Sequence, residues 1–272
     1  MPDITLSAIH VYPVKSLAGF APPSAEVHPR GLADDRRWML LDAAGHFLTQ
    51  RTLPRMALLS AFLSPSSLQI NGPDSPPLLV PLETPPDGPQ TRETLTVQVW
   101  RSVCEAVPVG AEADAWLSDT LGQPCRLVFM PDSVRRAVRP GPGGEEGIVS
   151  FADGYPLMLL GEASRGDLNA RLETPVPMNR FRPNLVVSGS DAFAEDGWKR
   201  IRVGAATFHV VKPCDRCVLT TVDQATGAAT GPEPLRTLAG YRLRDQKVLF
   251  GQHLIPQTLG VVRAGDPVEV LE

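Results

Sequence analysis

Two cysteines three positions apart are the strongest chemical signal in this sequence. Cys214 and Cys217 enclose an Asp-Arg pair, and such spacing occurs in zinc sites, in redox disulfides, and where one thiolate binds a metal beside a bystander thiol. A structural zinc ion needs four ligands. The other two cysteines, Cys104 and Cys125, are distant in sequence, and the five histidines are scattered, so zinc is disfavoured.

The residues around the cysteine pair predict an extended chain. Apolar and β-branched residues occupy 207–212 before the pair and 218–222 after it, so the helix that usually follows a redox dithiol is not expected. In an extended chain, residues three apart face opposite sides. We therefore predict one thiol facing a site and the other facing the core, with Arg216 favouring the thiolate of Cys217. Two buried and inert cysteines remain the alternative.

A second signal is a set of cations placed beside apolar segments. Each alone is typical of a surface side chain whose aliphatic stem packs on apolar neighbours. Together they can clamp an anionic ligand, because guanidinium groups grip phosphate in a bidentate way and lysine offers a point charge. The set comprises Lys15 with the adjacent Ser16, Arg36, Arg180 and Arg182.

A third signal is the segment 151–156, which reads Phe-Ala-Asp-Gly-Tyr-Pro. Its composition is typical of a β-turn that enters an apolar stretch. Backbone amides of this turn and the side chain of Tyr155 can contact a ligand, or the segment is a turn with no further role.

The elements that must position these residues are mainly strands. Short apolar segments alternate with turns rich in Pro, Gly, Asp and Ser, and the 272 residues include 23 Gly, 28 Pro and 43% hydrophobic residues. We predict a mainly β fold with a few helices (α+β) in two domains, 1–125 and 126–272. Strands are expected at 4–11, 37–41, 57–63, 78–82, 95–99, 184–188, 200–203, 207–212, 218–222 and 268–271, and helices at 111–121 and 164–172.

Two segments are predicted as loops. Residues 70–94 are rich in Pro, Gly and Asp, which indicates a loop around one edge strand. Residues 135–147 hold Arg135, Arg136 and Arg139 among glycines and prolines and predict a mobile surface loop. Such a basic loop can be a lid, or a docking surface for an acidic ferredoxin or flavodoxin.

Charge and sequence patterning exclude several classes of function. The net charge of −4 disfavours a nucleic-acid binder, which needs a basic surface to neutralise phosphates. Neither a secretory signal nor an apolar run of transmembrane length is found, and four cysteines are too few for a disulfide scaffold. We expect a cytoplasmic protein with reduced thiols and no association with membranes.

Several motifs in fixed order resemble the MOSC family, the molybdenum cofactor sulfurase C-terminal domain proteins. The resemblance is greatest to its two-domain branch, which contains the amidoxime-reducing components and their bacterial relatives. The matching segments are Tyr-Pro-Val-Lys-Ser at 12–16, Asp-Arg-Arg-Trp at 35–38, the turn at 151–156, Phe-Arg-Pro-Asn-Leu-Val-Val at 181–187, the cysteine segment at 214–223, Phe-Gly-Gln at 250–252 and Gly-Asp-Pro-Val at 265–268.

The resemblance implies an N-terminal β-barrel-like domain followed by a MOSC β-barrel domain, with the molybdenum cofactor (Mo-molybdopterin) held between them. It implies that the thiolate of Cys217 binds molybdenum, a soft ligand for a metal already held by sulfur. Substrate orientation or proton delivery would fall to Tyr155, Asp223 and His253. The remaining cofactor contacts would come from Lys15, Ser16, Arg36, Gly154, Tyr155, Arg180, Arg182, Asn184, Asp215 and Arg216.

Two positions depart from the family pattern. Asp215 stands where many relatives have Ser or Thr, and its charge beside an anionic cofactor requires a partner, for which Arg216 is the expected one. His253 stands where relatives usually have Asn after Phe-Gly-Gln, which can alter the substrate pocket.

The implied activity is reduction of N-hydroxylated compounds such as amidoximes, hydroxylamines and N-hydroxylated bases. The alternatives are a non-catalytic carrier of the cofactor or of sulfur on Cys217, and a redox or zinc Cys-x-x-Cys protein. Some relatives add a ferredoxin domain, but no cysteine follows Cys217, so we expect no iron–sulfur cluster in this chain. Electrons would then come from a separate ferredoxin, flavodoxin or cytochrome with its reductase. The membrane anchor of mitochondrial members is also not seen, which agrees with a cytoplasmic protein.

Overall fold

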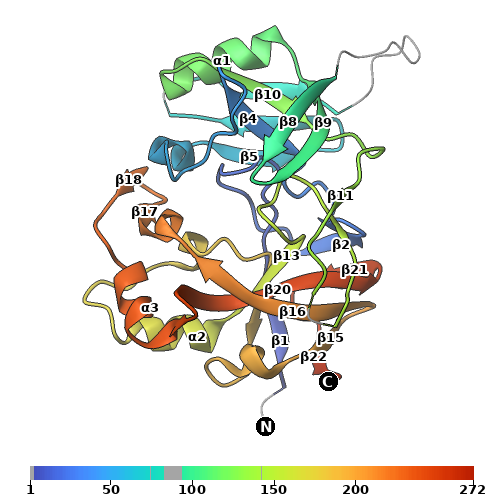
Figure 1. The fold of residues 1–272 in the computed structure, drawn as a ribbon, viewed down its shortest axis with the longest axis vertical. Coiled ribbons are helices and arrows are strands. Elements are labelled where there is room, and N and C mark those ends of the chain that lie inside the picture. Colours follow the sequence, from blue (N-terminus) through green and yellow to red (C-terminus); the bar gives the residue numbers. More distant parts are fainter. Residues whose placement is uncertain (1–2, 74, 83–93, 142) are drawn as a thin grey trace.

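The computed structural model describes residues 3–73, 75–82, 94–141 and 143–272. Strands dominate both halves of the molecule (Figure 1), which confirms the predicted mainly β fold. No helix within these residues is long and apolar enough to cross a membrane.

The upper half of Figure 1 contains two antiparallel sheets and one helix. One sheet has the order β4-β10-β9-β8, and the other the order β5-β6-β7. Their bounds are β4 (Trp38–Asp42), β5 (Ser60–Leu63), β6 (Ser67–Asn71), β7 (Leu78–Pro81), β8 (Leu95–Val99), β9 (Ser102–Pro108) and β10 (Cys125–Phe129).

The helix of this half, α1 (Ala111–Leu121), buries one apolar stripe. Ala113, Leu117 and Leu121 are buried in a core cluster shared with the strands, at the spacing of one helical face. Gly122 ends the helix in the left-handed conformation at φ 71°, which a glycine adopts without steric cost. The predicted helix and its stop residue are confirmed.

The lower half is built on an eight-stranded sheet with the order β1-β14-β13-β20-β16-β15-β22, to which β19 adds beside β20. Its strands are β1 (Thr5–Ile9), β13 (Leu157–Gly161), β14 (Leu185–Ser188), β15 (Arg200–Val203), β16 (Ala206–Arg216), β19 (Leu243–Arg244), β20 (Lys247–Thr258) and β22 (Val268–Val270). A second sheet joins β2 (Ser24–His28), β3 (Gly31–Leu32) and β21 (Gly260–Arg263).

Smaller elements complete the fold. Two-stranded ribbons form between β11 (Arg136–Ala137) and β12 (Ile148–Val149), and between β17 (Val222–Asp223) and β18 (Ala228–Ala229). The α-helices of the lower half are α2 (Glu162–Asn169) and α3 (Leu235–Arg242). Short 3-10 helices span η1 (Pro54–Leu58) in the upper half, and η2 (Met178–Arg180), η3 (Ala194–Gly197) and η4 (Val218–Thr221) in the lower half.

The first strands of the chain belong to the sheets of the lower half. Ile9 of β1 pairs with Leu185 of β14, and Val27 of β2 pairs with Gly260 of β21. Between these two strands, residues 10–20 reach the upper half, where Val14 forms a bridge with Trp38 and Ala18 with Ser60, so the segment that carries Lys15 and Ser16 runs between the two halves (Figure 1). The predicted division at residue 125 stays a prediction.

Three predicted elements need correction, and several others were not anticipated. The strand expected at 57–63 begins only at Ser60 because Pro54 starts a 3-10 helix. The mobile loop expected at 135–147 contains β11, and a 3-10 helix replaces the strand expected at 218–222. The elements not anticipated include helix α3, the long strand β20, and the strands β2, β6, β9, β10 and β21. Of the loop expected at 70–94, residues 74 and 83–93 lie outside the described residues.

Candidate functional site

A pocket lies where Lys15, Ser16, Arg36 and Arg51 approach the ends of β13 and β16. It brings together most of the residues singled out in the sequence, and it adds one cation that was missed, Arg51. The polar and sulfur-bearing wall consists of Lys15, Ser16, Arg36, Arg51, Asp153, Tyr155, Arg182, Asn184, Cys214, Asp215, Arg216, Cys217 and His253, with Gly154 between them.

Three residues of the wall have left-handed backbone conformations. Ser16, Arg36 and Arg182 have φ angles of 67°, 51° and 55°. A residue other than glycine adopts this conformation at an energetic cost, and such strain is characteristic of sites where function fixes the backbone. The strained positions here carry two of the cations of the wall and the hydroxyl beside Lys15.

Two of the arginines stack on one buried ring. The guanidinium carbons of Arg36 and Arg182 lie 4.4 and 4.2 Å from the ring centroid of Tyr12. Asn184 fixes the first of them, since Nη1 of Arg36 donates to its Oδ1 at 2.8 Å. Arg182 is 8% exposed, and its Nη2 has no hydrogen-bond partner among the described residues.

Burial lowers the pKa of Arg182 to about 10, so the group still carries its charge at neutral pH. A buried, charged donor without a partner is costly. An anionic ligand in the pocket would remove that cost.

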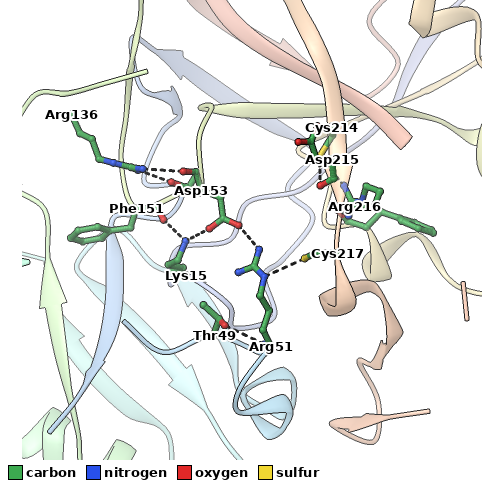
Figure 2. Close-up of polar contacts among 12 residues, drawn as sticks. Lys15, Thr49, Arg51, Arg136, Phe151, Asp153, Cys214, Asp215, Arg216 and Cys217 are labelled. Carbon is green, nitrogen blue, oxygen red and sulfur yellow. Dashed lines mark hydrogen bonds and ion pairs between the residues drawn. The ribbon is translucent and has the colours of Figure 1, made fainter. Parts of the chain in front are cut away.

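One carboxylate links the two halves of the molecule (Figure 2). Lys15 donates to Asp153 and, at 2.8 Å, to the carbonyl of Phe151. Arg51 donates from Nη2 to the other carboxylate oxygen of Asp153 at 2.6 Å. Burial would raise the pKa of Asp153, but the charges of Lys15 and Arg51 outweigh it and hold that pKa far below the usual range.

The turn that carries Asp153 is held by Arg136. Nη1 of Arg136 donates to the carbonyls of Ser150 and Ala152 at 2.7 and 2.6 Å, and Nη2 donates to that of Asp153 at 2.9 Å. The side chain is buried. Arg136 was predicted to belong to a mobile basic surface loop. It does not, because its buried guanidinium is engaged in hydrogen bonds to the carbonyls of this turn.

The two cysteines have different surroundings, as strand alternation predicts. Cys214 is 7% exposed and belongs to a core cluster with Phe181 and Phe250. Cys217 is half-buried, and its sulfur accepts a hydrogen bond from Nε of Arg51 at 3.2 Å (Figure 2). Both thiols are free, and both border the pocket.

Arg216 contacts Cys214, although from the sequence we expected it to act on Cys217. Its Nη1 lies 3.1 Å from the sulfur of Cys214, and its Nη2 donates to the carbonyl of Phe181 at 2.8 Å. Burial would raise the pKa of the Cys214 thiol, but the charges of His253 and Arg216 outweigh it and lower that pKa to about 6. The sulfur that Arg216 contacts is thus that of Cys214, and not that of its neighbour Cys217, for which the sequence suggested it.

Asp215 is also paired differently from expectation. Its carboxylate binds Lys247 at 2.7 Å and Lys212 at 3.5 Å, and not Arg216. Although partial burial would raise its pKa, these two lysines lower it. The carboxylate is therefore ionised and neutralised at the rim of the pocket.

The segment after Cys217 folds as the 3-10 helix η4 because two threonines bond back to the main chain. Oγ1 of Thr220 donates to the carbonyl of Cys217 at 3.0 Å, and Oγ1 of Thr221 donates to that of Val218 at 2.8 Å. Such local bonds compete with strand pairing. They override the β propensity of Val, Leu and Thr on which the strand prediction rested.

Arg180 and Asp223 form an ion pair outside the pocket. Nη2 of Arg180 lies 2.7 Å from the carboxylate of Asp223, and Nη1 lies 3.3 Å from the carbonyl of Thr220. The structure thus places this pair against η4 and does not bring it together with the residues of the wall. Its contacts support the turn that follows Cys217.

Tyr155 and His253 stack at the opposite wall. Their ring centroids are 4.9 Å apart with an interplanar angle of 28°. Nδ1 of His253 is buried and has no partner among the described residues. Two proton-bearing groups therefore border the pocket beside Gly154, where a Cβ would meet no neighbour within 4 Å.

The side chains of the pocket suit a metal that is already held by a cofactor rather than a metal ion bound by the protein alone. In the part of the chain that the structure describes, no three His, Cys, Asp or Glu side chains gather as a metal site. Cys104 and Cys125 are buried in core clusters of the upper half and cannot complete a zinc site with Cys217. One accessible sulfur beside several cations fits an anionic metal cofactor better than a bare ion.

Comparison with known proteins agrees with these features. Residues 3–124 match the MOSC N-terminal beta barrel domain, and residues 146–269 match the MOSC domain. Mitochondrial amidoxime-reducing component 1 of Xenopus laevis is 35% identical over 97% of this chain and 81% of its own length. For component 1 of Homo sapiens the identity is 33%, over 98% and 83%.

Mitochondrial amidoxime reducing component 2 of Homo sapiens is 33% identical over 97% of this chain and 82% of its own length. Among solved structures, the YUAD protein of Bacillus subtilis aligns over 98% of this chain and 97% of its own, with 11% identity and a TM-score of 0.45. The extent of the family matches and the identity to the curated relatives decide the assignment. The chain is a two-domain member of the MOSC family, related to the mitochondrial amidoxime-reducing components.

Proposed function

We propose that this protein is a molybdenum-cofactor-dependent reductase of N-hydroxylated compounds. The observation that carries the proposal is a half-buried cysteine sulfur, Cys217, in a pocket whose walls hold more cations than carboxylates and include the unpartnered Arg182. The names of the relatives, which describe reduction of amidoximes, support the same reaction class.

The residues of the wall fit the cofactor by their chemistry. Cys217 would bind molybdenum through its thiolate, a soft ligand suited to this metal. Lys15, Ser16, Arg36 and Arg182 would hold the anionic phosphate and pterin, the arginines in bidentate contacts. Asn184 would keep Arg36 in place through the hydrogen bond already described.

The overall reaction requires two electrons and two protons for each N–O bond broken. When bound, the cofactor supplies the electrons, and the products are the amine or amidine and water. Tyr155 and His253, whose rings stack at the wall of the pocket, would deliver protons to the nitrogen and to the departing oxygen or would orient the substrate. Asp223, held by Arg180 outside the pocket, is not assigned a part in this step.

The electrons must reach the site from a donor. We propose a separate redox protein of ferredoxin, flavodoxin or cytochrome type, because the four cysteines are the two buried in the upper half and the two at the pocket, which leaves no cysteine set for an iron–sulfur cluster. The curated relatives are named mitochondrial, so the cytoplasmic location stays a prediction.

The decisive experiment measures molybdenum, pterin and reductase activity in the wild type and in Cys217→Ser. Both proteins would be purified from a host that makes the cofactor, and Cys125→Ala, which removes a thiol buried in the upper half, is the control. We expect near-stoichiometric molybdenum in the wild type and the control, and its loss in Cys217→Ser. Benzamidoxime with a chemically reduced dye as electron donor would report activity.

Two other results would overturn the proposal. If Cys217→Ser kept its molybdenum and its activity, the assignment of the ligand would be wrong. If the loaded wild type never oxidised the reduced dye with any N-hydroxylated compound, the protein would instead be a carrier of the cofactor or of sulfur on Cys217.

A further inference from the structure

A second groove opens directly beside the pocket and shares one wall with it. Asp153, Gly154, Tyr155 and Asp215 border both cavities. The groove has a volume of about 850 Å³, larger than a single aromatic ring requires. Its remaining charged and aromatic lining comprises Trp100, Arg101, Arg136, Arg139, Lys212 and Lys247.

The carboxylates of this groove are already neutralised. Asp153 is bound by Lys15 and Arg51, and Asp215 by Lys212 and Lys247. The groove therefore has an excess of positive charge that its own acidic residues do not balance.

Arg101 and Arg139 carry that excess at the mouth of the groove. Both are exposed, and neither forms an ion pair with any residue that the structure describes. They come from separate elements, the turn between β8 and β9 and the segment after β11. Arg136, in contrast, is occupied by the carbonyls of the turn at 150–153.

An exposed indole joins the groove to the cysteine sulfur. Trp100 is 47% exposed and has a left-handed φ of 55°. Its ring lies 5.0 Å from the guanidinium carbon of Arg51, the residue whose Nε contacts Cys217. Phe47 meets the same ring edge-on at 5.2 Å, so a flat aromatic surface of the groove lies against the arginine that contacts the sulfur.

We propose that this groove binds a carboxylate or phosphate group on the part of the substrate remote from the N–O bond. The inference rests on the proposed reductase function and deepens it. The preferred substrates are planar N-hydroxylated compounds that carry a negative charge, with the ring against Trp100 and the anion between Arg101 and Arg139. A cationic rim of this kind raises both the affinity for an anion and its rate of arrival, and salt weakens both effects.

The test compares matched neutral and anionic substrates. Benzamidoxime is paired with 4-carboxybenzamidoxime, and N4-hydroxycytidine with its 5′-monophosphate, each with a chemically reduced dye as donor. For each pair we take the kcat/KM of the anionic substrate divided by that of the neutral one, which cancels any effect of a substitution on the reaction with the dye. In the wild type we expect this ratio to exceed one and to fall as ionic strength rises.

The variant is the double substitution Arg101→Gln with Arg139→Gln, and the matched control is Arg135→Gln, an exposed arginine outside the groove. We expect the double variant to lower the ratio about fivefold or more at low ionic strength, since exposed charge contacts are individually modest. The neutral substrates should keep their kcat/KM. The control should change neither quantity.

The outcomes separate this inference from the function on which it rests. If no N-hydroxylated compound is reduced, the proposed function fails. If all are reduced but the double variant leaves the ratios unchanged, the anion site is wrong. If the double variant slows turnover only with a protein electron donor, the same arginines dock that donor, which also overturns the anion site. A fall confined to the monophosphate pair or to the carboxylate pair identifies which anion the groove accepts.

Discussion

The surroundings of Cys214 and those of Cys217 differ although three residues separate them. Both sulfurs border the pocket, but Cys214 is buried among aromatic residues with Arg216 on its sulfur, whereas Cys217 is half-buried with Arg51 on its sulfur. Both arginines bring positive charge to a sulfur. Arg216 comes from the same strand, but Arg51 comes from the other half of the molecule.

This difference shows how one short motif serves two purposes. The contacts of Cys214 hold β16 against its own core, while those of Cys217 depend on the correct approach of the two halves. Structural changes near Cys214 should therefore be seen mainly in stability, and changes near Cys217 mainly in activity.

The largest contrast is expected from removal of each sulfur in turn. Cys217→Ala should lower reductase activity by at least about 100-fold, as expected for loss of a metal ligand, whereas Cys214→Ala should lower it by less than about tenfold. Activity per mole of protein and molybdenum content would be measured for both. Equal losses in the two variants would remove the distinction between the cysteines.

A substitution at Gly251 tests whether the contacts around Cys214 contribute to the stability of the protein. It has φ 81°, and a Cβ there would lie 2.4 Å from Cε of Met158 and 2.8 Å from the carbonyl oxygen of Leu159. Since the sulfur of Met158 contacts Arg216, crowding at this point disturbs the support of Cys214. We expect Gly251→Ala to lower the free energy of unfolding by about 3 kcal/mol.

The matched control for that variant is Gly166→Ala in α2, where a Cβ meets nothing within 4 Å. It should raise the stability by about 0.5–1 kcal/mol, because alanine restricts the unfolded chain more than glycine does. Denaturant unfolding measures both. If Gly251→Ala left the free energy of unfolding unchanged, this part of strand β20 could shift at little cost.

Substitutions of Arg51 and Arg216 should have different effects, the first mainly on activity and the second mainly on stability. Arg51→Gln removes the contact to Cys217 and one partner of Asp153, and we expect kcat/KM to fall about 10- to 100-fold. Arg216→Gln removes contacts to a buried sulfur and to the carbonyl of Phe181, and should cost about 1–3 kcal/mol of stability. Kinetics and thermal unfolding on both variants check this, and a reversed pattern would contradict the comparison.

The last test is a pH dependence of stability that belongs to Cys214. Its pKa of about 6 in the folded protein lies below the ordinary value of 9.0, so between these values the unfolded chain binds a proton that the folded chain has lost. The free energy of unfolding should therefore rise with pH through this window, by at most about 1.4 kcal/mol per pH unit. In Cys214→Ala, the free energy of unfolding should not show this rise with pH. If the free energy of unfolding depended on pH in the same way in the wild type and in Cys214→Ala, the rise could not be due to Cys214.

Strand alternation predicted the different surroundings of the two cysteines, and it also explains the error about Arg216. Residues two apart on a strand face the same side, so Arg216 shares a face with Cys214 and not with its neighbour Cys217. The same rule, applied to the arginine as well as to the cysteines, identifies the contact seen in the structure.

Arg51 could not be found in this way. It lies in a turn after Thr49 with no periodicity or motif, and its role appears only when the two halves meet. Helix α1, by contrast, was predictable because its apolar stripe and Gly122 are local features. Local patterns thus predicted elements and faces, while the contacts across the pocket required the tertiary structure.

The position of the first strand has a consequence for the order of folding. β1 pairs with β14, and the amide of Leu6 donates to the carbonyl of Asp266, so contacts of very high sequence separation close the lower sheet. Such contacts form slowly, because a long chain must lose entropy before they give stability. The segment bearing Lys15 and Ser16 follows directly from β1, but it is also held by nearby parts of the chain, since the amide of Lys15 donates to the carbonyl of Trp38 and that of Ala18 to the carbonyl of Leu59. Completion of the pocket wall still depends on distant residues, because Asp153 reaches Lys15 from 138 positions along the chain, so the wall is complete only after contacts of this kind have formed.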